Sequence, residues 1–362
     1  MTGAADLATI KKQKPTMRDV ANLAGVSVMT VSRVLAGRQK VSAKARARVL
    51  RAVEQISYVP DYNAGSLSSQ RSHFVALILP TLTNSNFADT AEGLTEVLTT
   101  HGYRPLIGYS SYSLEQEEAL IRVMLARRPD AIVLVGAEHT KAAVIMLHQS
   151  GIPVVEIWER PQHPIDISIG YSNVDVGRLA AQHLIALGHT RIAALGAGQA
   201  GAVIDLRGEQ RLAGFSAALK EAGISTDLVI RTARPPFSFT QGADAMKLLL
   251  AQAPDVQAVF VVSDLPAVGA VMECHRQGIC VPEQISVMGF GDFEVGVQCV
   301  PSLTTVSVNA RLIGQRTGEY LVDLLDSREP AAGPRPVTVD LGFELLVRTS
   351  TAPARALAAA SA

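Results

Sequence analysis

Two kinds of apolar pattern follow one another along the chain. Up to about residue 58, apolar residues recur at helical spacing, whereas from Phe74 onward short apolar runs alternate with amphipathic stretches. The first pattern predicts a small all-helical domain, and the second predicts strands that alternate with helices and form parallel sheets. We therefore expect an N-terminal all-α domain followed by a doubly wound α/β body.

Three helices are predicted in the N-terminal domain. The first begins after Thr16, because this hydroxyl can cap the first turn while Asp19 places a carboxylate at the positive helix end. Ser27, after a glycine suited to a tight turn, is placed to cap the second helix, and Ser42 to cap a third over roughly 43–57. Their apolar positions are expected to form a miniature core of Val20, Ala21, Leu23, Ala24, Val31, Val34, Leu35, Val49, Leu50, Val53 and Ile56.

The second helix leaves one side of its N-terminal half exposed. That side carries Val28, Met29, Thr30, Ser32 and Arg33. Two short helices joined by a sharp turn can place such a face in the major groove of DNA. The same pattern also occurs in small helical bundles that bind no ligand, so the helices alone leave both interpretations open.

Several spaced motifs then agree in order. Residues 19–35 read DVANLAGVSVMTVSRVL, residues 41–49 read VSAKARARV, and residues 58–67 read YVPDYNAGSL. These segments resemble the signature of the LacI family of transcriptional regulators, and the resemblance continues through most of the remaining chain. It implies a helix-turn-helix DNA-binding domain over residues 15–59 and a hinge helix or linker over residues 60–71.

The resemblance also assigns DNA contacts. Thr30 and Arg33 match groove-facing positions, and an arginine can pair with both acceptors on a guanine edge. Val28 and Met29 can contact thymine methyl groups, although Met29 can instead pack against the neighbouring helix. The other expected contacts in this domain come from Arg18 and from Thr16, Ser27 and Ser32, whose hydroxyls can anchor phosphates without reading sequence.

The predicted linker follows Pro60, which stops the third helix. The resemblance implies a hinge helix that forms only when two subunits sit on DNA. Leu67 matches the leucine that wedges between base pairs in the minor groove, and Ala64 matches the small residue that lets two hinge helices approach. Gly65 lowers the intrinsic stability of such a helix. A plain flexible linker is the alternative.

The body of about 270 residues suits two lobes better than one. Strands are predicted at the apolar runs FVALILP, DAIVLVG, IPVVEIW, RIAALG, QAVFVVS, ISVMGF and LTTVSV, and an amphipathic helix is predicted after most of them. The resemblance implies a periplasmic-binding-protein-like fold that crosses between lobes near residues 170, 302 and 330. The expected first lobe spans about 72–171 and 303–329, and the second about 172–302 and 330–348, with a ligand cleft at the carboxyl ends of the strands.

Seven residues near predicted strand ends are the expected effector contacts: Asn86, Phe87, Glu156, Arg211, Ser263, Asp264 and Asp292. Arg211 matches the family's effector-anchoring arginine, whose fork suits a carboxylate or paired hydroxyls. Glu156 ends an otherwise apolar run, where a carboxylate without partners would be costly. Each acidic residue can instead cap a helix or close the lobes through a salt bridge, which is the favoured interpretation for Asp264. Asp292 lies one position later than the acidic residue of many relatives.

Charge is unevenly distributed. Residues 1–71 hold 12 Lys and Arg against 4 Asp and Glu, an excess of eight positive charges. The whole chain has 33 of each, so the remainder has 21 against 29 and an excess of eight negative charges. A basic head suits contact with phosphates, and an acidic body would be repelled by DNA. Residues 1–14 are expected to be a disordered basic arm, and residues 349–362 a disordered tail.

Other function classes find little support in the sequence. Three cysteines without a CxxC pair and eight scattered histidines favour reduced thiols over a disulfide framework or metal site, and no cofactor is expected. No signal peptide or run of about 20 apolar residues is evident, so a cytoplasmic, nucleoid-associated protein is expected. An α/β sugar enzyme with a fused DNA-binding head would need a catalytic constellation, and a secreted solute-binding protein would have no use for residues 16–67.

The sequence therefore predicts a homodimeric regulator that binds palindromic operator DNA and is released by a small effector. The segments ILPTLTNSNFAD, IPVVEIW and GFGDFEVG resemble the gluconate-operon repressors within the family. A sugar acid such as gluconate or a ketogluconate is the expected effector, since Arg211 could hold its carboxylate. A neutral sugar, a phosphosugar or a purine is the alternative. The C-terminal stretch lacks leucine heptads, so a tetramer through a terminal bundle is not expected.

Overall fold

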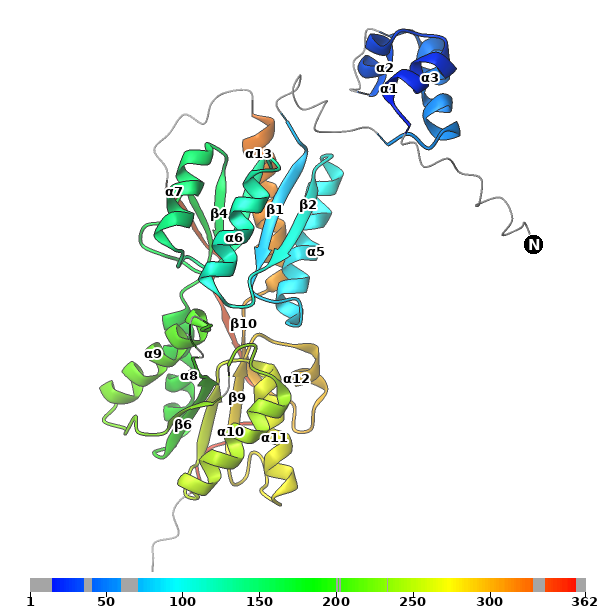
Figure 1. Ribbon diagram of the computed structural model, residues 1–362. Coiled ribbons are helices and arrows are strands. Elements are labelled where there is room, and N and C mark those ends of the chain that lie inside the picture. Colours follow the sequence, from blue (N-terminus) through cyan, green and yellow to red (C-terminus); the bar gives the residue numbers. More distant parts are fainter. Residues whose placement is uncertain are drawn as a thin grey trace, which may run out of the picture. The chain divides into compact units, whose positions relative to one another are not determined.

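The computed structural model describes residues 15–35, 41–59, 71–199, 201, 203–232, 234–327 and 336–355. The chain divides into two compact units, residues 1–72 and 73–362 (Figure 1). The helices within the described residues do not combine the length and apolar character that a bilayer span requires.

The first unit contains three helices, α1 (Met17–Ala24), α2 (Val28–Leu35) and α3 (Ala43–Gln55). Their starts follow the predicted caps. The Asp19 N–H donates to the Thr16 hydroxyl at 3.3 Å, and the Asp19 carboxylate accepts from the Thr16 N–H at 2.8 Å, which forms a capping box. The Thr16 hydroxyl and the Thr16 N–H both donate to the Asp19 carboxylate, which lowers the pKa of Asp19. Ser27 and Ser42 each accept from the N–H three residues on, at 3.2 and 3.3 Å.

A miniature core joins these helices, and its buried members are Val20, Ala21, Ala24, Val31, Val34, Val49, Ala52 and Tyr58. The prediction was wrong for Leu23 and Leu50, which are 46% and 51% exposed. Each lies roughly 100° around its helix from the centre of the buried stripe, so apolar character alone misplaced it.

The second unit consists of two lobes, each built on a six-stranded sheet. The first sheet has the order β11-β5-β4-β3-β1-β2 and is parallel throughout. Its strands are β1 (Phe74–Leu79), β2 (Arg104–Tyr109), β3 (Ala131–Val135), β4 (Val154–Ile157), β5 (Ile167–Gly170) and β11 (Val337–Asp340). Helices α5 (Ser85–Thr100) and α13 (Ala310–Asp326) pack together, as do α6 (Leu114–Leu125) and α7 (Lys141–Ser150). Alternate residues of β1 enter two separate apolar clusters, so both faces of the sheet are covered.

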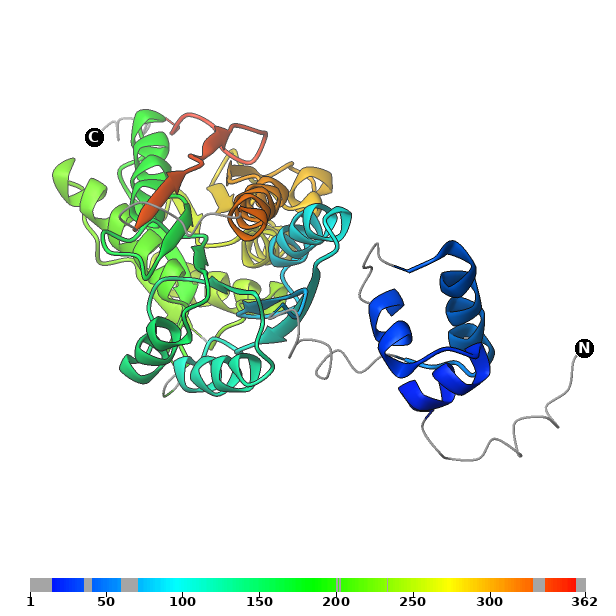
Figure 2. The same cartoon turned by 90° about the horizontal axis from the view of Figure 1, so that it is seen from above.

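The second sheet has the order β12-β10-β9-β8-β6-β7, and only the pairing of β10 with β12 is antiparallel among its strands. Its strands are β6 (Ile192–Ala197), β7 (Val229–Thr232), β8 (Ala258–Val261), β9 (Ser286–Phe290), β10 (Thr304–Ser307) and β12 (Glu344–Leu346). Its helices are α8 (Asn173–Ala186), α9 (Leu206–Glu221), α10 (Phe239–Gln252), α11 (Asp264–Arg276) and the short α12 (Glu294–Gln298). Helix α8 packs against α9, and α10 packs against α11 (Figures 1 and 2).

The chain crosses between the lobes three times, after β5, after β10 and after β11. The predicted crossings near 302 and 330 were wrong. Residues 304–307 belong to the second sheet and residues 337–340 to the first, so these crossings lie near 308 and 342. An apolar run predicts a strand, but which sheet it joins depends on tertiary packing that the run does not encode.

The end of the described chain also differs from the prediction. Residues 349–355 were expected to be disordered, but they are fixed against the second lobe. The Ser350 hydroxyl accepts from the Thr304 N–H at 2.8 Å, and the Ala354 N–H donates to the carbonyl of Leu187 at 2.8 Å. Ser350 is fully buried. Main-chain hydrogen bonds can hold a small, polar segment in place, and such a segment has no apolar pattern from which its order could be predicted.

Candidate functional site

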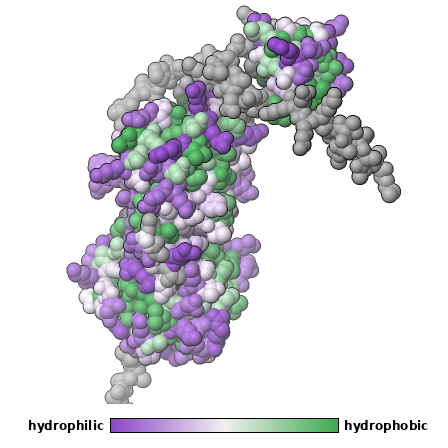
Figure 3. Space-filling model, viewed as in Figure 1, coloured by the Kyte–Doolittle hydropathy of each residue, from purple (hydrophilic) through white to green (hydrophobic). Residues whose placement is uncertain are grey.

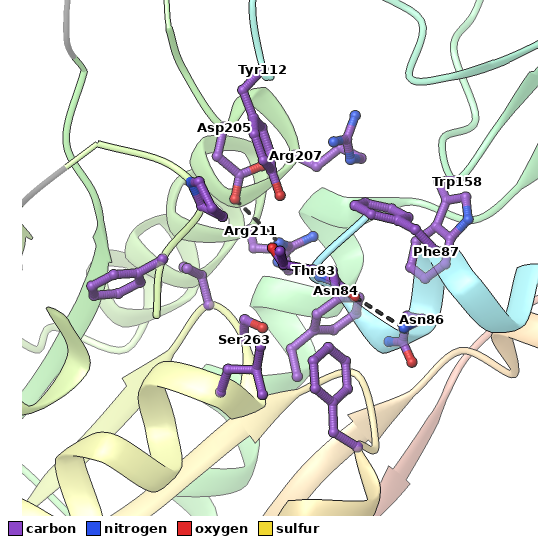
Figure 4. Close-up of a pocket in the computed structure, with 16 residues that line it drawn as sticks. Thr83, Asn84, Asn86, Phe87, Tyr112, Trp158, Asp205, Arg207, Arg211 and Ser263 are labelled. Atoms are coloured by element: carbon purple, nitrogen blue, oxygen red, sulfur yellow. Dashed lines mark hydrogen bonds and ion pairs between the residues drawn. The ribbon is translucent and has the colours of Figure 1, made fainter. Parts of the chain in front are cut away.

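A cavity lies between the lobes at the carboxyl ends of their parallel strands, where ligands of such folds bind (Figure 4). It encloses about 600 Å³, counted with its mouth open to solvent. The first lobe contributes the start of α5, Tyr112 and Trp158. The second contributes the start of α9 and residues that follow β8 and β9. The space-filling view shows polar and apolar surface meeting at the junction of the lobes (Figure 3).

Helix α9 carries the charged residues of the cavity. Asp205 caps it by accepting from the Gly208 N–H at 3.1 Å, and Arg207 and Arg211 lie one turn apart on the same face. The helix sits very close to α8, because a Cβ added at Gly177 would lie 1.9 Å from the carbonyl oxygen of Arg211. Only glycine permits this approach, which fixes the position of both guanidiniums.

Arg211 is buried and held from three sides. Its Nη1 donates to the side-chain oxygen of Asn173 at 2.5 Å, its Nη2 lies 3.8 Å from an Asp205 oxygen, and its guanidinium sits 4.1 Å from the ring centroid of Phe290. Burial lowers the pKa of Arg211, and the Asp205 carboxylate opposes that shift. Its buried Nε has no hydrogen-bond partner among the described residues. An acceptor brought by a ligand would satisfy it.

Arg207 reaches from the second lobe to the first. Its Nη1 donates to the Val135 carbonyl at 3.3 Å and lies 3.7 Å from a Glu159 oxygen, while its guanidinium is 5.7 Å from the Phe87 ring centroid. Burial acts to lower the pKa of Arg207, but Asp205 and Glu159 outweigh it, and the pKa is raised. Two neighbouring guanidiniums can bind a carboxylate or phosphate through several charge-assisted hydrogen bonds.

The first lobe provides amides and aromatic rings. The Asn86 amide donates to the Gly291 carbonyl of the second lobe at 2.9 Å. Phe87 and Trp158 pack edge to face with ring centroids 5.1 Å apart, and the indole N–H of Trp158 donates to the Thr90 hydroxyl at 3.2 Å. Such rings can cover the apolar face of a sugar, while neighbouring polar groups take its hydroxyls.

A second cavity of about 380 Å³ adjoins the first, and Tyr112 and Arg207 line both. The Ile204 N–H donates to the Tyr112 carbonyl at 3.3 Å, which joins the two lobes along this side. The second cavity is also lined by Glu117, Glu138 and Glu159. The cleft therefore has a chamber rich in arginine and aromatic groups beside one rich in carboxylates.

The structure brings four of the seven predicted effector residues together. Asn86, Phe87, Arg211 and Ser263 all line the larger cavity. Glu156 does not, which corrects the prediction. As a residue of β4 it points to the same face as Val154, where its carboxylate accepts from the Ile165 N–H at 2.7 Å and is 1% exposed.

His139 holds two buried glutamates in this part of the first lobe. Its Nδ1 lies 2.5 Å from Glu117 and its Nε2 lies 3.5 Å from Glu156. Burial acts to lower the pKa of His139, but the hydrogen bond that its ring makes to Glu117 and the nearby Glu156 carboxylate outweigh it and raise the pKa to about 9. Glu156 is thus part of an internal ionic cluster, which explains its place in an apolar run.

Asp264 and Asp292 also lie outside the residues that line the cavity, contrary to prediction. Asp264 is fully buried and accepts from the Phe293 N–H at 2.9 Å and the Thr305 hydroxyl at 2.7 Å. Burial raises its pKa to about 7. Asp292 pairs with Arg348 within the second lobe. Both carboxylates therefore fasten loops of that lobe.

Several cavity residues were not predicted from the sequence, namely Tyr112, Trp158, Asp205 and Arg207. Arg207 had a usable signal, since it lies one helical turn before Arg211 and so shares its face. Tyr112 had none, because it follows β2, a strand that the apolar runs did not predict. Among the described residues, no group of three or more His, Cys, Asp or Glu side chains is placed to hold a metal ion.

The helical unit presents the expected DNA-contacting face. Met29 is 62% and Val28 is 42% exposed, so Met29 does not pack into the miniature core. The Ser27 and Thr30 hydroxyls are 2.9 Å apart. The remaining expected contacts are exposed or partly exposed: Thr16, Arg18, Ser32 and Arg33. The predicted hinge residues Ala64 and Leu67 lie outside the described residues.

Comparisons with known proteins agree with this architecture. The family model of bacterial regulatory proteins of the lacI family matches residues 16–61, and a periplasmic binding protein-like domain matches residues 181–351. The chain is 39% identical to the HTH-type transcriptional regulator GntR of Pseudomonas aeruginosa, over 93% of this chain and 96% of that protein.

Two solved structures extend the comparison. A LacI-family transcriptional regulator from Silicibacter pomeroyi is 32% identical with a TM-score of 0.85, over 93% of this chain and 99% of that one. The lac repressor dimer bound to operator and the anti-inducer ONPF is 26% identical with a TM-score of 0.77, over 94% of this chain and all of that one.

Proposed function

The chain belongs to the LacI family of bacterial regulatory proteins, and we propose that it represses sugar-acid catabolism genes until a sugar acid occupies the interlobe cleft. As a DNA-binding transcriptional regulator of this family it acts as a dimer on operator DNA and responds to a small molecule. The proposal concerns the identity of that molecule, the direction of the response and the residues that carry them.

The observation that carries the proposal is the pair of buried guanidiniums, Arg207 and Arg211, in an aromatic-lined cavity. A carboxylate can take N–H donors from both side chains, including the Nε of Arg211, which no described residue accepts from. The rings of Phe87 and Trp158 suit the carbon chain of a polyhydroxylated ligand, and Asn86 and Ser263 can exchange hydrogen bonds with its hydroxyls. An aldonate such as gluconate, or a ketogluconate, offers all three features.

Coupling to DNA follows from the two-lobed fold. The lobes are joined by three chain crossings and by contacts such as Asn86 to Gly291, so a ligand between them can bias their relative arrangement. That arrangement alters the spacing or order of two hinge segments, with Leu67 and Ala64 in the roles implied by the family resemblance. A sugar acid must bind one arrangement better than the other, since equal affinity would shift nothing.

In the N-terminal unit, α2 is the helix that we assign to the major groove. Arg33 and Thr30 read base edges, Val28 and Met29 contact thymine methyl groups, and hydroxyls such as Ser27 hold phosphates. A dimer with two such helices requires two half-sites related by a two-fold axis, which is the reason to expect a palindromic operator.

Calorimetry and gel-shift assays on the full-length protein test the proposal. Gluconate or a ketogluconate should release heat on binding and weaken the complex with a palindromic operator, whereas glucose and a purine base should do neither. Binding of a neutral sugar, a purine or only 6-phosphogluconate, with no response to unphosphorylated sugar acids, would overturn the effector assignment. Tighter operator binding with gluconate would overturn the direction of the response.

A neutral sugar is the second candidate. It is favoured by the aromatic lining, because Phe87, Trp158, Phe237, Phe290 and Phe293 all border the cavity. A neutral ligand would leave the two arginines paired only with protein groups. Competition between gluconate and glucose in the same titration separates the two candidates directly.

A further inference from the structure

Glu159 is a carboxylate of the first lobe that is held by two side chains of the second. One of its oxygens lies 3.7 Å from Nη1 of Arg207, and the other accepts from the Gln210 amide at 3.1 Å. Both partners belong to α9, and Glu159 is 5% exposed. One carboxylate therefore bridges the lobes at the wall between the two cavities.

The pairing of Glu159 with Arg207 is geometrically loose. At 3.7 Å it is longer than a hydrogen bond, and it uses the same Nη1 that donates to the Val135 carbonyl. A guanidinium binds a carboxylate best through two parallel N–H donors. A ligand carboxylate that takes Arg207 in this two-pronged manner from the larger cavity would out-compete Glu159.

Displacement would leave the buried Glu159 without Arg207, its nearest cation. Burial already raises its pKa, while Arg207 and the Gln210 hydrogen bond hold it down. The other charged groups that face it are Glu138, which raises the pKa, and His139, which lowers it. Losing Arg207 removes the largest opposing influence, and a buried carboxyl in that position is more stable protonated.

We propose that Glu159 is an internal competitor for Arg207, which the carboxylate of the ligand displaces, and that the displaced Glu159 takes up one proton from solvent. This inference rests on the proposed function, since it assumes a sugar-acid ligand. The ligand carboxylate stays ionised and bonds to Arg207. The solvent proton bonds to a Glu159 oxygen, so the charge of the cleft is unchanged by binding.

Such a competitor determines which ligands occupy the cleft. A small anion such as acetate cannot replace Glu159 without other contacts, and a neutral sugar has no charge with which to compensate Arg207. A sugar acid adds its hydroxyl and ring contacts to the carboxylate and can meet both requirements. Glu159 is therefore a specificity-determining residue, because an anion binds only when its other contacts offset the displacement of Glu159.

The sign of the pH dependence follows from proton uptake. The complex binds one more proton than the separate partners, so affinity for the sugar acid rises as pH falls, by up to about tenfold per pH unit. The dependence is confined to the range in which Glu159 is ionised before binding and protonated after it. The carboxyl of the ligand itself, with a pKa of about 3.5, stays ionised throughout.

Calorimetry of the full-length protein with gluconate, in buffers of different ionisation enthalpy, tests this directly. In titrations at several pH values, the wild-type protein should take up close to one proton wherever Glu159 is ionised before binding, and its affinity should weaken as pH rises. Glu159→Gln keeps the shape and the Gln210 contact but cannot titrate. It should bind without proton uptake, with a nearly flat pH profile, about tenfold more tightly near pH 8, and with stronger competition from acetate.

Glu209→Gln is the matched control, since this carboxylate of α9 pairs with Arg231 and lines neither cavity. It should retain proton uptake and the wild-type slope. Asp264 remains in every variant, so uptake that persists in Glu159→Gln belongs elsewhere and overturns the inference.

The wild-type proton count tests the inference even if Glu159→Gln does not fold. Gluconate binding without proton uptake leaves the proposed function standing and removes the role of Glu159. No binding of any sugar acid by the wild-type protein removes both.

Discussion

The two lobes share a parallel-sheet architecture, yet they bring different chemistry to the cleft. The first lobe supplies amides and aromatic rings at the start of α5, including Asn86 and Phe87. The second supplies Arg207, Arg211 and Asp205 at the start of α9. Aromatic rings line both walls, but the amides come from one wall and the charged groups from the other, so the walls should contribute unequally to effector affinity.

The largest effect is expected from Arg211→Met. The change keeps most of the volume but leaves Asp205 and Asn173 without their buried partner and removes a donor to the ligand. Affinity for gluconate should fall by about 100-fold or more, roughly 3 kcal/mol, measured by calorimetry. Operator binding should persist and no longer respond to gluconate.

Arg231→Met is the matched control for that change. Arg231 also pairs with a carboxylate of α9, Glu209 at 2.8 Å, but its side chain is 44% exposed and lies outside the cavity. Exposed pairs of this kind contribute about 1 kcal/mol or less. Equal loss of affinity in the two variants would mean that α9 acts through stability rather than through Arg211.

The buried carboxylates of the two lobes have different partners, so they should respond differently to pH. Asp264 in the second lobe has neutral donors and a pKa of about 7, well above that of an unfolded aspartate. The folded chain therefore holds a proton that the unfolded chain has released, and the free energy of unfolding falls as pH rises through that interval. This decrease in the free energy of unfolding should be on the order of 3 kcal/mol between about pH 4 and about pH 7, and Asp264→Asn should abolish it.

Urea unfolding across this range measures the difference between wild type and Asp264→Asn. The exposed Asp244→Asn, on α10, should keep the wild-type slope. In the first lobe, by contrast, Glu117 and Glu156 have His139 as partner, whose raised pKa of about 9 keeps it charged there. An unchanged slope in Asp264→Asn would show that its carboxyl is not the group that titrates.

Some elements of the fold were predictable from the sequence and others were not. The helix caps of the N-terminal unit were predicted because Thr16, Ser27 and Ser42 act on N–H groups within three residues. Apolar runs likewise identified most of the buried central strands, but not β5, although it lies between β4 and β11 and is buried throughout. The edge strands β2 and β7 were not predicted, since each pairs on one side only and is partly exposed. Membership of β10 and β11 in a lobe could not be predicted, because it is decided by long-range pairing.

Residues of the site were predictable only where helical spacing or a motif of the family pointed to them. Arg211 was predicted from its motif, and Arg207 could have been, from helical spacing. Glu156 and Glu159 show the limit of such reasoning. Both are buried carboxylates after an apolar run, but strand alternation turns Glu156 into the first lobe, whereas Glu159 lies beyond β4 and meets α9 across the cleft. A sequence pattern does not specify which partner approaches from another lobe.

An intermediate effect is expected from glycines at helix contacts. A Cβ at Gly177 would lie 1.9 Å from the Arg211 carbonyl, and one at Gly93 would lie 2.3 Å from the Arg311 carbonyl in the first lobe. Gly177→Ala and Gly93→Ala should each lower the free energy of unfolding by about 1–3 kcal/mol, measured in urea. Only Gly177→Ala should also weaken gluconate binding, since α9 carries the arginines. Equal losses of affinity would contradict the unequal roles of the walls.

The smallest effect is expected from Asn86→Ala, on the amide wall. The change removes the hydrogen bond to the Gly291 carbonyl and one candidate partner for a ligand hydroxyl, but no charge. A neutral hydrogen bond contributes about 1 kcal/mol, so affinity for gluconate should fall by about fivefold in calorimetry. Ser85→Ala, one residue earlier on α5 and exposed, should leave affinity unchanged. If Asn86→Ala lowered affinity as much as Arg211→Met, the first lobe would dominate recognition, and the ligand would be held by its hydroxyls rather than by a carboxylate.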